Sequence, residues 1–76
     1  MKSKIKIILK EILPKGIIIY DKTDLIKRGY LDSFSLMVLI TSLEKKFKVK
    51  ISLAKININY LSSIDKIEKY IKKINK

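Results

Sequence analysis

Apolar residues recur every three or four positions in three separate stretches of the chain. The stretches are Ser3–Leu13, Ser33–Lys46 and Ile64–Ile74. This spacing places the apolar side chains on one face of an α-helix, so three amphipathic helices are predicted. Pro14 and Gly16 follow the first stretch and end it. The positions predicted to face the core are Ile5, Ile8, Leu9 and Ile12, then Leu36, Leu39, Ile40, Leu43 and Phe47, then Ile64, Ile67, Ile71 and Ile74.

The connection between the first two predicted helices is long. It covers residues 17–30, and a loop of this length inside a small domain needs its own buried anchors. Asp24–Arg28 is predicted to form one helical turn before Gly29. A strand over residues 17–20 is the alternative, because β-branched residues favour that state, with residues 49–51 as its one candidate partner. The predicted anchors are Ile17, Ile19, Leu25 and Ile26.

The second connection is predicted to be extended or irregular over Val49–Ile58 and to turn once at Asn59–Leu61. Ser63 stands directly before the third apolar stretch, where a serine oxygen can cap a helix by accepting a hydrogen bond from a backbone N–H. Ser62 and Asp65 are spaced like the two members of a capping box, with Asp in place of the usual Glu. The last helix is therefore expected to start at a capped N-terminus.

The length of the chain limits the architecture that these helices can form. With 76 residues, of which 47% are hydrophobic, the chain suffices for one small domain with one modest core. The predicted fold is all-α. It is a small bundle of four helices, three long and one short, with a long first loop, in a single domain that covers residues 1–76.

The side chains that most enzymes use for chemistry are scarce in this chain. Cysteine and histidine are absent, which removes disulfides, thiol nucleophiles, most zinc-site designs and the commonest general base. Asp32 and Ser33 form a poor base–nucleophile pair, because adjacent residues at a helix start point in different directions. The sequence therefore predicts a protein that is not an enzyme and has no metal site of its own.

The sequence contains no recognisable targeting signal, which predicts a cytoplasmic location. No signal peptide is evident, and the longest uninterrupted apolar run, residues 36–40, is far too short to cross a bilayer. We therefore expect a cytoplasmic protein that acts as a monomer and does not insert stably into a membrane.

The net charge of +11 is high for so small a domain. It fits binding to phosphate backbones or to anionic membrane surfaces, and the first helix could lie on a membrane as well as pack in a core. Lysine, isoleucine and asparagine all have A/T-rich codons, so genome composition explains the same excess without a partner. A small basic nucleic-acid-binding helical domain is therefore the alternative. Against it, the chain has one Arg, three Asn and no Gln to read base edges.

The second apolar stretch opens with the residues Gly-Tyr-Leu-Asp-Ser-Phe-Ser-Leu-Met, which are positions 29–37. Ser33 stands at the first helical position, where free backbone N–H groups and the helix dipole favour a negatively charged group. A serine at that position can also simply cap the helix. Four residues lie off the inward stripe and are predicted to form a contact surface: Phe34, Met37, Val38 and Thr41. The alternative is that Met37 and Val38 widen the core face.

This stretch and the helix that follows it resemble the phosphopantetheine attachment region of acyl carrier proteins. In that family a Gly-hydrophobic-hydrophobic-Asp-Ser-Leu segment opens the second helix, which ends in Leu-Glu-x-x-Phe before a short extended segment. The resemblance covers roughly residues 25–74 and implies an acyl-carrier-like bundle. The matching residues are Gly29 to Leu36, then Leu39, Ile40, Leu43, Glu44 and Phe47, then Val49 and Ile51.

The resemblance implies that Ser33 carries 4′-phosphopantetheine, taken from coenzyme A and attached through a phosphodiester. The arm would hold thioester-linked acyl or aminoacyl groups for partner enzymes. The implied partners are a phosphopantetheinyl transferase, a ligase that loads the arm, and downstream acyl-processing enzymes. Asp32 and Phe34 flank the attachment residue and are implied in cofactor binding. The residues implied in partner docking are Phe34, Met37, Val38 and Thr41.

Two departures from the family pattern change the expected role. Ser35 and Val38 occupy positions that are often Asp and Glu in fatty-acid carriers, and Lys45 and Lys46 follow Glu44. A partner with a basic docking patch would be repelled by this helix. The sequence therefore favours a specialised carrier, loaded with an amino acid, as D-alanyl carrier proteins are, or with an unusual acyl group. The residues expected to line a bound acyl chain are Leu39, Leu43 and Ile67.

Overall fold

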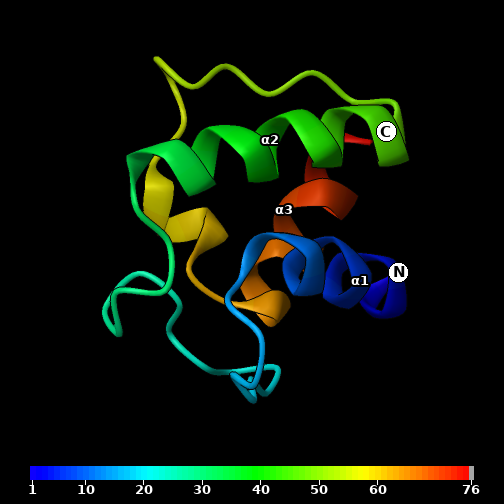
Figure 1. Cartoon of the computed structure of the whole chain (residues 1–76). Helices are drawn as coiled ribbons and strands as arrows, with labels where there is room; N and C mark the ends of the chain where they lie inside the picture. The colour runs from blue at the N-terminus through cyan, green and yellow to red at the C-terminus, as the bar shows by residue number, and fades with distance from the viewer. Residues whose placement is uncertain (76) are drawn as a thin grey trace.

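The three amphipathic stretches form α-helices in the computed structural model, which describes residues 1–75 (Figure 1). The helices are α1 (Lys2–Ile12), α2 (Ser33–Phe47) and α3 (Ile64–Ile74), with one 3-10 turn, η1 (Ile58–Leu61). The all-α prediction is confirmed. The prediction of four helices is only roughly right, because the fourth element is a single 3-10 turn. Lys76, the last residue of the predicted domain, lies outside the described residues.

α3 has the predicted bounds, whereas the C-terminal ends of α1 and α2 each differ from the predicted ones by one residue, for local reasons. α1 stops at Ile12, and Leu13 is extended, with φ −80° and ψ 153°. This follows from Pro14, because a proline ring clashes with a helical conformation of the residue before it. α2 continues to Phe47, and Lys48 adopts the left-handed conformation, with φ 55°, that commonly ends a helix.

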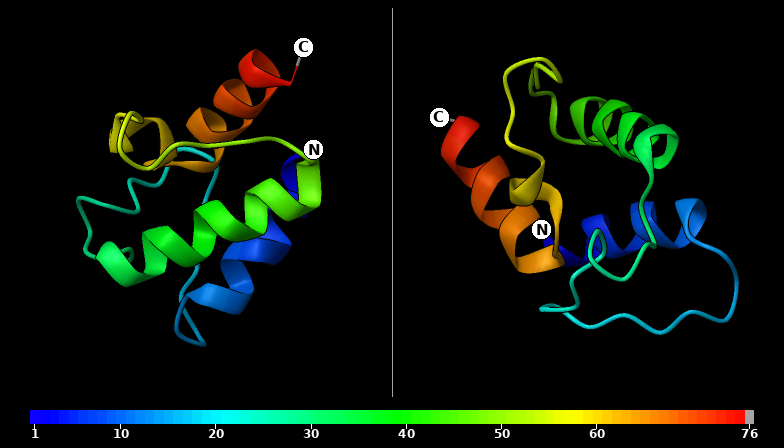
Figure 2. Two further views of the ribbon diagram at one scale, coloured as in Figure 1. Left: turned by 90° about the horizontal axis from the view of Figure 1, so that it is seen from above. Right: turned by 90° about the vertical axis from the view of Figure 1, so that its left-hand side faces the viewer.

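The core lies between the three helices. α1 contacts both α2 and α3, and η1 packs on α3 (Figure 2). Most predicted inward positions are buried, whereas Ile12, Phe47 and Ile74, each close to a helix C-terminus, are partly buried against the core. The residues with no exposed surface are Ile5, Leu9, Leu25, Leu39, Leu43, Leu61, Ile64, Ile67 and Ile71.

The first connection is anchored chiefly through Leu25, which is fully buried. Its backbone N–H donates to the carbonyl of Ser62 over 2.6 Å, and its own carbonyl accepts hydrogen bonds from Tyr30 and Leu31. The predicted helical turn is present, and the Asp24 carboxylate caps it by accepting from the N–H of Lys27 over 2.8 Å. Residues 17–20 form no strand. The other predicted anchors, Ile17, Ile19 and Ile26, are half-buried.

The start of α3 confirms one capping prediction and contradicts another. The Ser63 hydroxyl accepts from the N–H of Lys66 over 3.2 Å, as expected of the residue that caps a helix. The prediction that Ser62 and Asp65 form a capping box is wrong. The Ser62 hydroxyl donates to the carbonyl of Asn59, and the Asp65 carboxylate lies 2.8 Å from the ammonium of Lys2.

Lys2 is the centre of an ion-pair cluster that joins α1, the first loop and α3. Its ammonium pairs with Asp65 and, over 3.2 Å, with Asp21, which also lies 3.4 Å from Lys6. The hydrogen bond from Lys2 is the main reason why the pKa of Asp21 lies below its ordinary value of 3.8. The side chains are half-exposed, so salt screens the cluster.

The contribution of this cluster should depend on pH with a definite sign. Since the folded state lowers the pKa of Asp21, the stabilisation is complete above the ordinary pKa of 3.8 and is lost as pH falls through the folded-state pKa. We expect Asp21→Asn to melt a few degrees below wild type at pH 7, and the difference should shrink as pH falls below 3.8. Thermal melts between pH 2 and 7 measure this. Glu11→Gln, which removes an α1 carboxylate outside the cluster, is the control, and an Asp21→Asn deficit that stays constant over this pH range would contradict the prediction.

Candidate functional site

Ser33 is the first residue of α2 and is exposed to solvent. The residue before it, Asp32, is the one that caps the helix. Its carboxylate accepts from the N–H of Ser35 over 2.8 Å, and its backbone is extended, with φ −101° and ψ −174°. The alternative that Ser33 stands there as the cap is therefore wrong. Its hydroxyl is left at the surface, next to the positive end of the helix dipole.

Asp32 is held in its charged form by the helix that it caps. The Ser35 N–H donates to the carboxylate, and this hydrogen bond is the main reason why the pKa of Asp32 is lower than its ordinary value. This capping role is not among the roles predicted for Asp32, which follow from the family resemblance alone. The signal was available in the sequence, because Asp directly before a helical stretch is among the most favoured caps.

The turn into α2 depends on a glycine. Gly29 has φ +75°, a conformation that residues with a side chain rarely adopt. Two residues later Leu31 is buried and fixes the chain against the core. The positive φ followed by a buried leucine brings Asp32 and Ser33 to the surface at the start of the helix, where a large partner can reach them.

The residues beside Ser33 present an apolar surface. The exposed fractions are 74% for Phe34, 54% for Met37 and 37% for Val38, and Thr41 is also exposed. Their predicted position off the core stripe is confirmed, and the alternative that Met37 and Val38 widen the core is wrong. The Thr41 hydroxyl donates to the carbonyl of Met37 over 3.0 Å, so it is already bonded within the helix.

Charge on α2 is distributed unevenly. Its one carboxylate, Glu44, is half-buried and accepts from the N–H of Ile51 over 3.0 Å, which ties down the chain after the helix. Lys45 and Lys46 are exposed in the last turn, and Lys48 follows them. The outer surface of α2 is therefore apolar near Ser33 and positive at its far end.

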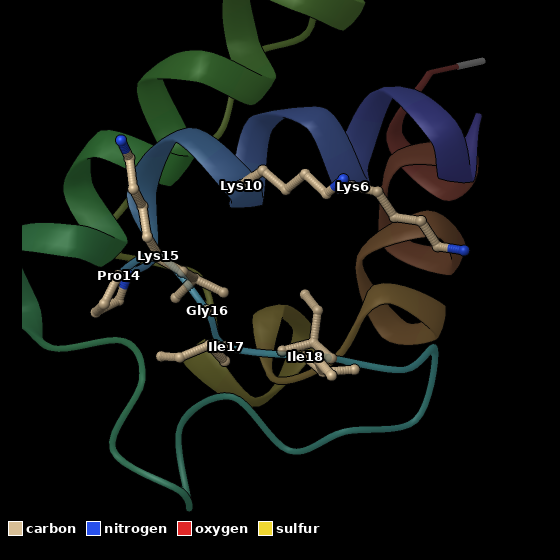
Figure 3. A pocket seen from close by; sticks show the side chains of 9 residues that line it. Lys6, Lys10, Pro14, Lys15, Gly16, Ile17 and Ile18 are labelled. Atoms are coloured by element: carbon tan, nitrogen blue, oxygen red, sulfur yellow. The ribbon is translucent and has the colours of Figure 1, made fainter.

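A cavity of about 430 Å³ lies elsewhere, between the end of α1 and the first loop (Figure 3). Leu13 and Ile17–Ile19 form much of its wall, and the side chain of Lys10 runs along one edge. No residue of α2 lines it. Leu39, Leu43 and Ile67, the residues expected to line an acyl chain, have no exposed surface, so an acyl chain could reach them only if the helices moved apart.

Comparison with known protein families gives one match, and it covers most of the chain. The phosphopantetheine attachment site family matches residues 3–71. This chain belongs to that family. Phosphopantetheine attachment domains carry a covalent 4′-phosphopantetheine group and are generally carriers rather than catalysts. No curated protein and no solved structure matched in the other two comparisons.

The geometry around Ser33 fits the group that the phosphopantetheine attachment family carries. A phosphodiester needs an accessible hydroxyl and gains from nearby N–H donors, and the exposed N-terminus of α2 offers both. Within residues 1–75 there is no group of three or more potential metal ligands, and no helix there is long and apolar enough to span a bilayer.

The cap of α2 can be separated from the charge of its carboxylate by mutation. Asp32→Ala removes the acceptor for the Ser35 N–H, so we expect it to melt several degrees below wild type. Asp32→Asn keeps an acceptor and should melt close to wild type, because Asn caps helices about as well as Asp. Thermal unfolding followed by circular dichroism gives both values. Equal melting of Asp32→Ala and wild type would show that the cap contributes nothing.

Proposed function

We propose that this protein is an acyl or aminoacyl carrier whose 4′-phosphopantetheine arm is attached to Ser33. One observation carries the proposal: Ser33 is exposed at the first position of α2 while Asp32 supplies the cap. The hydroxyl is therefore free for chemistry in the segment that matches the family pattern. The protein supplies the attachment point, and partner enzymes supply the catalysis.

The attachment reaction uses a single atom of this chain. The Ser33 oxygen forms a bond to the phosphorus that carries the pantetheine, and the bond from that phosphorus to the rest of coenzyme A breaks. Adenosine 3′,5′-bisphosphate leaves, and the hydroxyl proton passes to a base of the transferase. Magnesium belongs to the transferase, which must shield the phosphate charges. The new phosphodiester stays beside the positive end of α2, which favours an anion.

The proposed partners act on one exposed face of α2. They are the phosphopantetheinyl transferase, a loading ligase and later acyl-processing enzymes, and Asp32, Phe34, Met37, Val38 and Thr41 form the proposed contact area. The one carboxylate of α2, Glu44, is hydrogen-bonded to the Ile51 N–H, so the acidic helix of fatty-acid carriers is not reproduced. This difference supports a specialised carrier. The thioester on the arm is the chemistry that the cysteine-free chain obtains from its cofactor.

A mass spectrum tests the proposal directly. Incubation with coenzyme A, magnesium and a broad-specificity phosphopantetheinyl transferase should add about 340 Da, the mass of the 4′-phosphopantetheinyl group. Peptide fragmentation should place the added mass on Ser33. No gain with several transferases, or a gain on another residue, would overturn the proposal.

The positive charge should not act as a specific nucleic-acid site. Lysines lie on α1, in both connections, on α2 and on α3, so they form no single stripe that follows one groove. We expect titration with duplex DNA to show weak association that is blind to sequence and is lost as salt is raised. Fluorescence anisotropy at two salt concentrations measures this. Tight binding at physiological salt with preference for one sequence would favour the nucleic-acid alternative instead.

A further inference from the structure

The phosphopantetheinyl transferase must touch α2 itself. Later enzymes act on the far end of a long arm even where they also contact α2, whereas the transferase must bring coenzyme A to the Ser33 oxygen. Ser33 is the first residue of α2, and the exposed residues that follow it are on the helix rather than on a loop. The composition of this helix surface therefore constrains the transferase more directly than any other partner.

The outer surface of α2 is an ordered stripe. Phe34, Val38, Thr41 and Lys45 are spaced by four, three and four residues, so at 100° per residue they share one side of the helix. All four are exposed, and Met37 lies beside them. Because the Thr41 hydroxyl is bonded to the Met37 carbonyl, it offers a partner less polar surface than a free hydroxyl would. We call these five residues the α2 stripe.

The stripe changes character along its length. Its first half is apolar, and its second half ends at Lys45, with Lys46 and Lys48 close by. The Glu44 carboxylate accepts from the Ile51 N–H, and within residues 1–75 it forms no ion pair with these lysines. Glu11 on α1 lines the groove that also holds Lys45 and Lys46, and it is the one carboxylate there beside three lysines.

We infer that the transferase for this carrier docks on the α2 stripe. An apolar recess beside the active site of the transferase receives the apolar half of the stripe, and carboxylates of the transferase pair with Lys45 and Lys46. This deepens the proposed function and rests on it. The docking surface of this transferase is negatively charged, whereas that of a transferase that recognises an acidic helix is positively charged. The lysines of α2 therefore also exclude enzymes with a basic docking surface. The apolar half fixes the position of Ser33, and the positive half fixes the direction of the helix.

The positive half of the stripe should affect docking and not the transfer step. Lys45 lies about 16 Å along the helix axis from Phe34, at a rise of 1.5 Å per residue. This is about two Debye lengths at physiological ionic strength, so the charge at Lys45 is screened from the reacting phosphate. Changes at Lys45 and Lys46 should therefore appear in KM and leave kcat unchanged.

Steady-state kinetics with the transferase of the source cells tests the inference, with mass gain as the readout. We expect Lys45→Glu with Lys46→Glu to raise KM about tenfold at unchanged kcat. Val38→Asp should also raise KM about tenfold, because it places a charge in the apolar recess. The matched control is Lys69→Glu with Lys73→Glu on α3, which reverses the same charge away from α2 and should change KM less than about twofold. Added salt should raise the KM of wild type and not that of the Lys45/Lys46 variant.

The outcomes separate the inference from the proposed function. A Lys45/Lys46 variant with wild-type or lower KM would overturn the carboxylate half, and an unchanged KM for Val38→Asp would overturn the apolar half. In either case wild type would still gain the arm, and the carrier function would stand. Failure of a broad-specificity transferase in excess to modify wild type would instead overturn the carrier function. Circular dichroism of each variant, expected to match wild type, shows that the helices are intact.

Discussion

Ser33→Ala should abolish phosphopantetheinylation completely. The substitution removes the one oxygen that the proposed reaction uses, and alanine offers no other nucleophile at the first position of α2. The fold should be retained, because Asp32 rather than Ser33 caps the helix and the Ser33 side chain is exposed. Intact-protein mass spectrometry after incubation with coenzyme A and a broad-specificity transferase measures the loss, and circular dichroism confirms the fold.

Ser35→Ala is the matched control for this experiment. Asp32 accepts from the backbone N–H of Ser35, which the substitution leaves in place. Ser35→Ala should therefore keep the cap and acquire the arm at close to the wild-type rate. If Ser33→Ala still gained the arm, the attachment point would be another residue, and the proposed role of the α2 N-terminus would be wrong.

Leu39→Ala should have a large effect on stability. Leu39 has no exposed surface and lies at the middle of the helix, facing the core. Truncation of a buried leucine to alanine costs about 2–5 kcal/mol, from lost burial and from the cavity left behind. A domain of this size is stable by roughly 4–11 kcal/mol, so the variant should lose a large part of its free energy of unfolding. Urea unfolding followed by helical signal measures the change.

Leu53→Ala provides the comparison for this truncation. Leu53 lies in the loop after α2 and is 47% exposed, so the same change should alter the free energy of unfolding by less than about 0.5 kcal/mol. Equal effects at Leu39 and Leu53 would mean that the described core does not stabilise the protein. A Leu39→Ala variant that unfolds without a cooperative transition would agree with the expected loss.

The helices were predictable because their cause is local. Apolar spacing places Leu36, Leu39 and Leu43 on one face wherever the rest of the chain lies. The ion pairs of Asp65 were not predictable in this way. A serine three residues before an acid suggested a local cap, but the carboxylate is paired with Lys2, at the opposite end of the sequence. A local sequence pattern does not show which distant cation will pair with the Asp65 carboxylate.

The candidate site was predictable in part for the same reason. The segment around Ser33 has a recognisable order of residues, and its first helical position follows from the apolar pattern that begins there. The hydrogen bond between Glu44 and the N–H of Ile51 depends on the conformation of the loop after α2, which no periodic sequence pattern predicts. The exposure of Met37 likewise depends on where α1 and α3 pack, because its position on the helix is at the edge of the apolar stripe.

The hydrogen bond between Leu25 and Ser62 determines when the first loop can fold during synthesis of the chain. The buried anchor of the first loop has its carbonyl partner far downstream, so the loop cannot settle until that part of the chain has been translated. At 5–20 residues per second, about 2–7 s of synthesis separates the two. Ser33 is translated within that interval, before the residues of α3. The first loop, which leads into α2 and Ser33, is therefore fixed against the core only after Ser62 has been made.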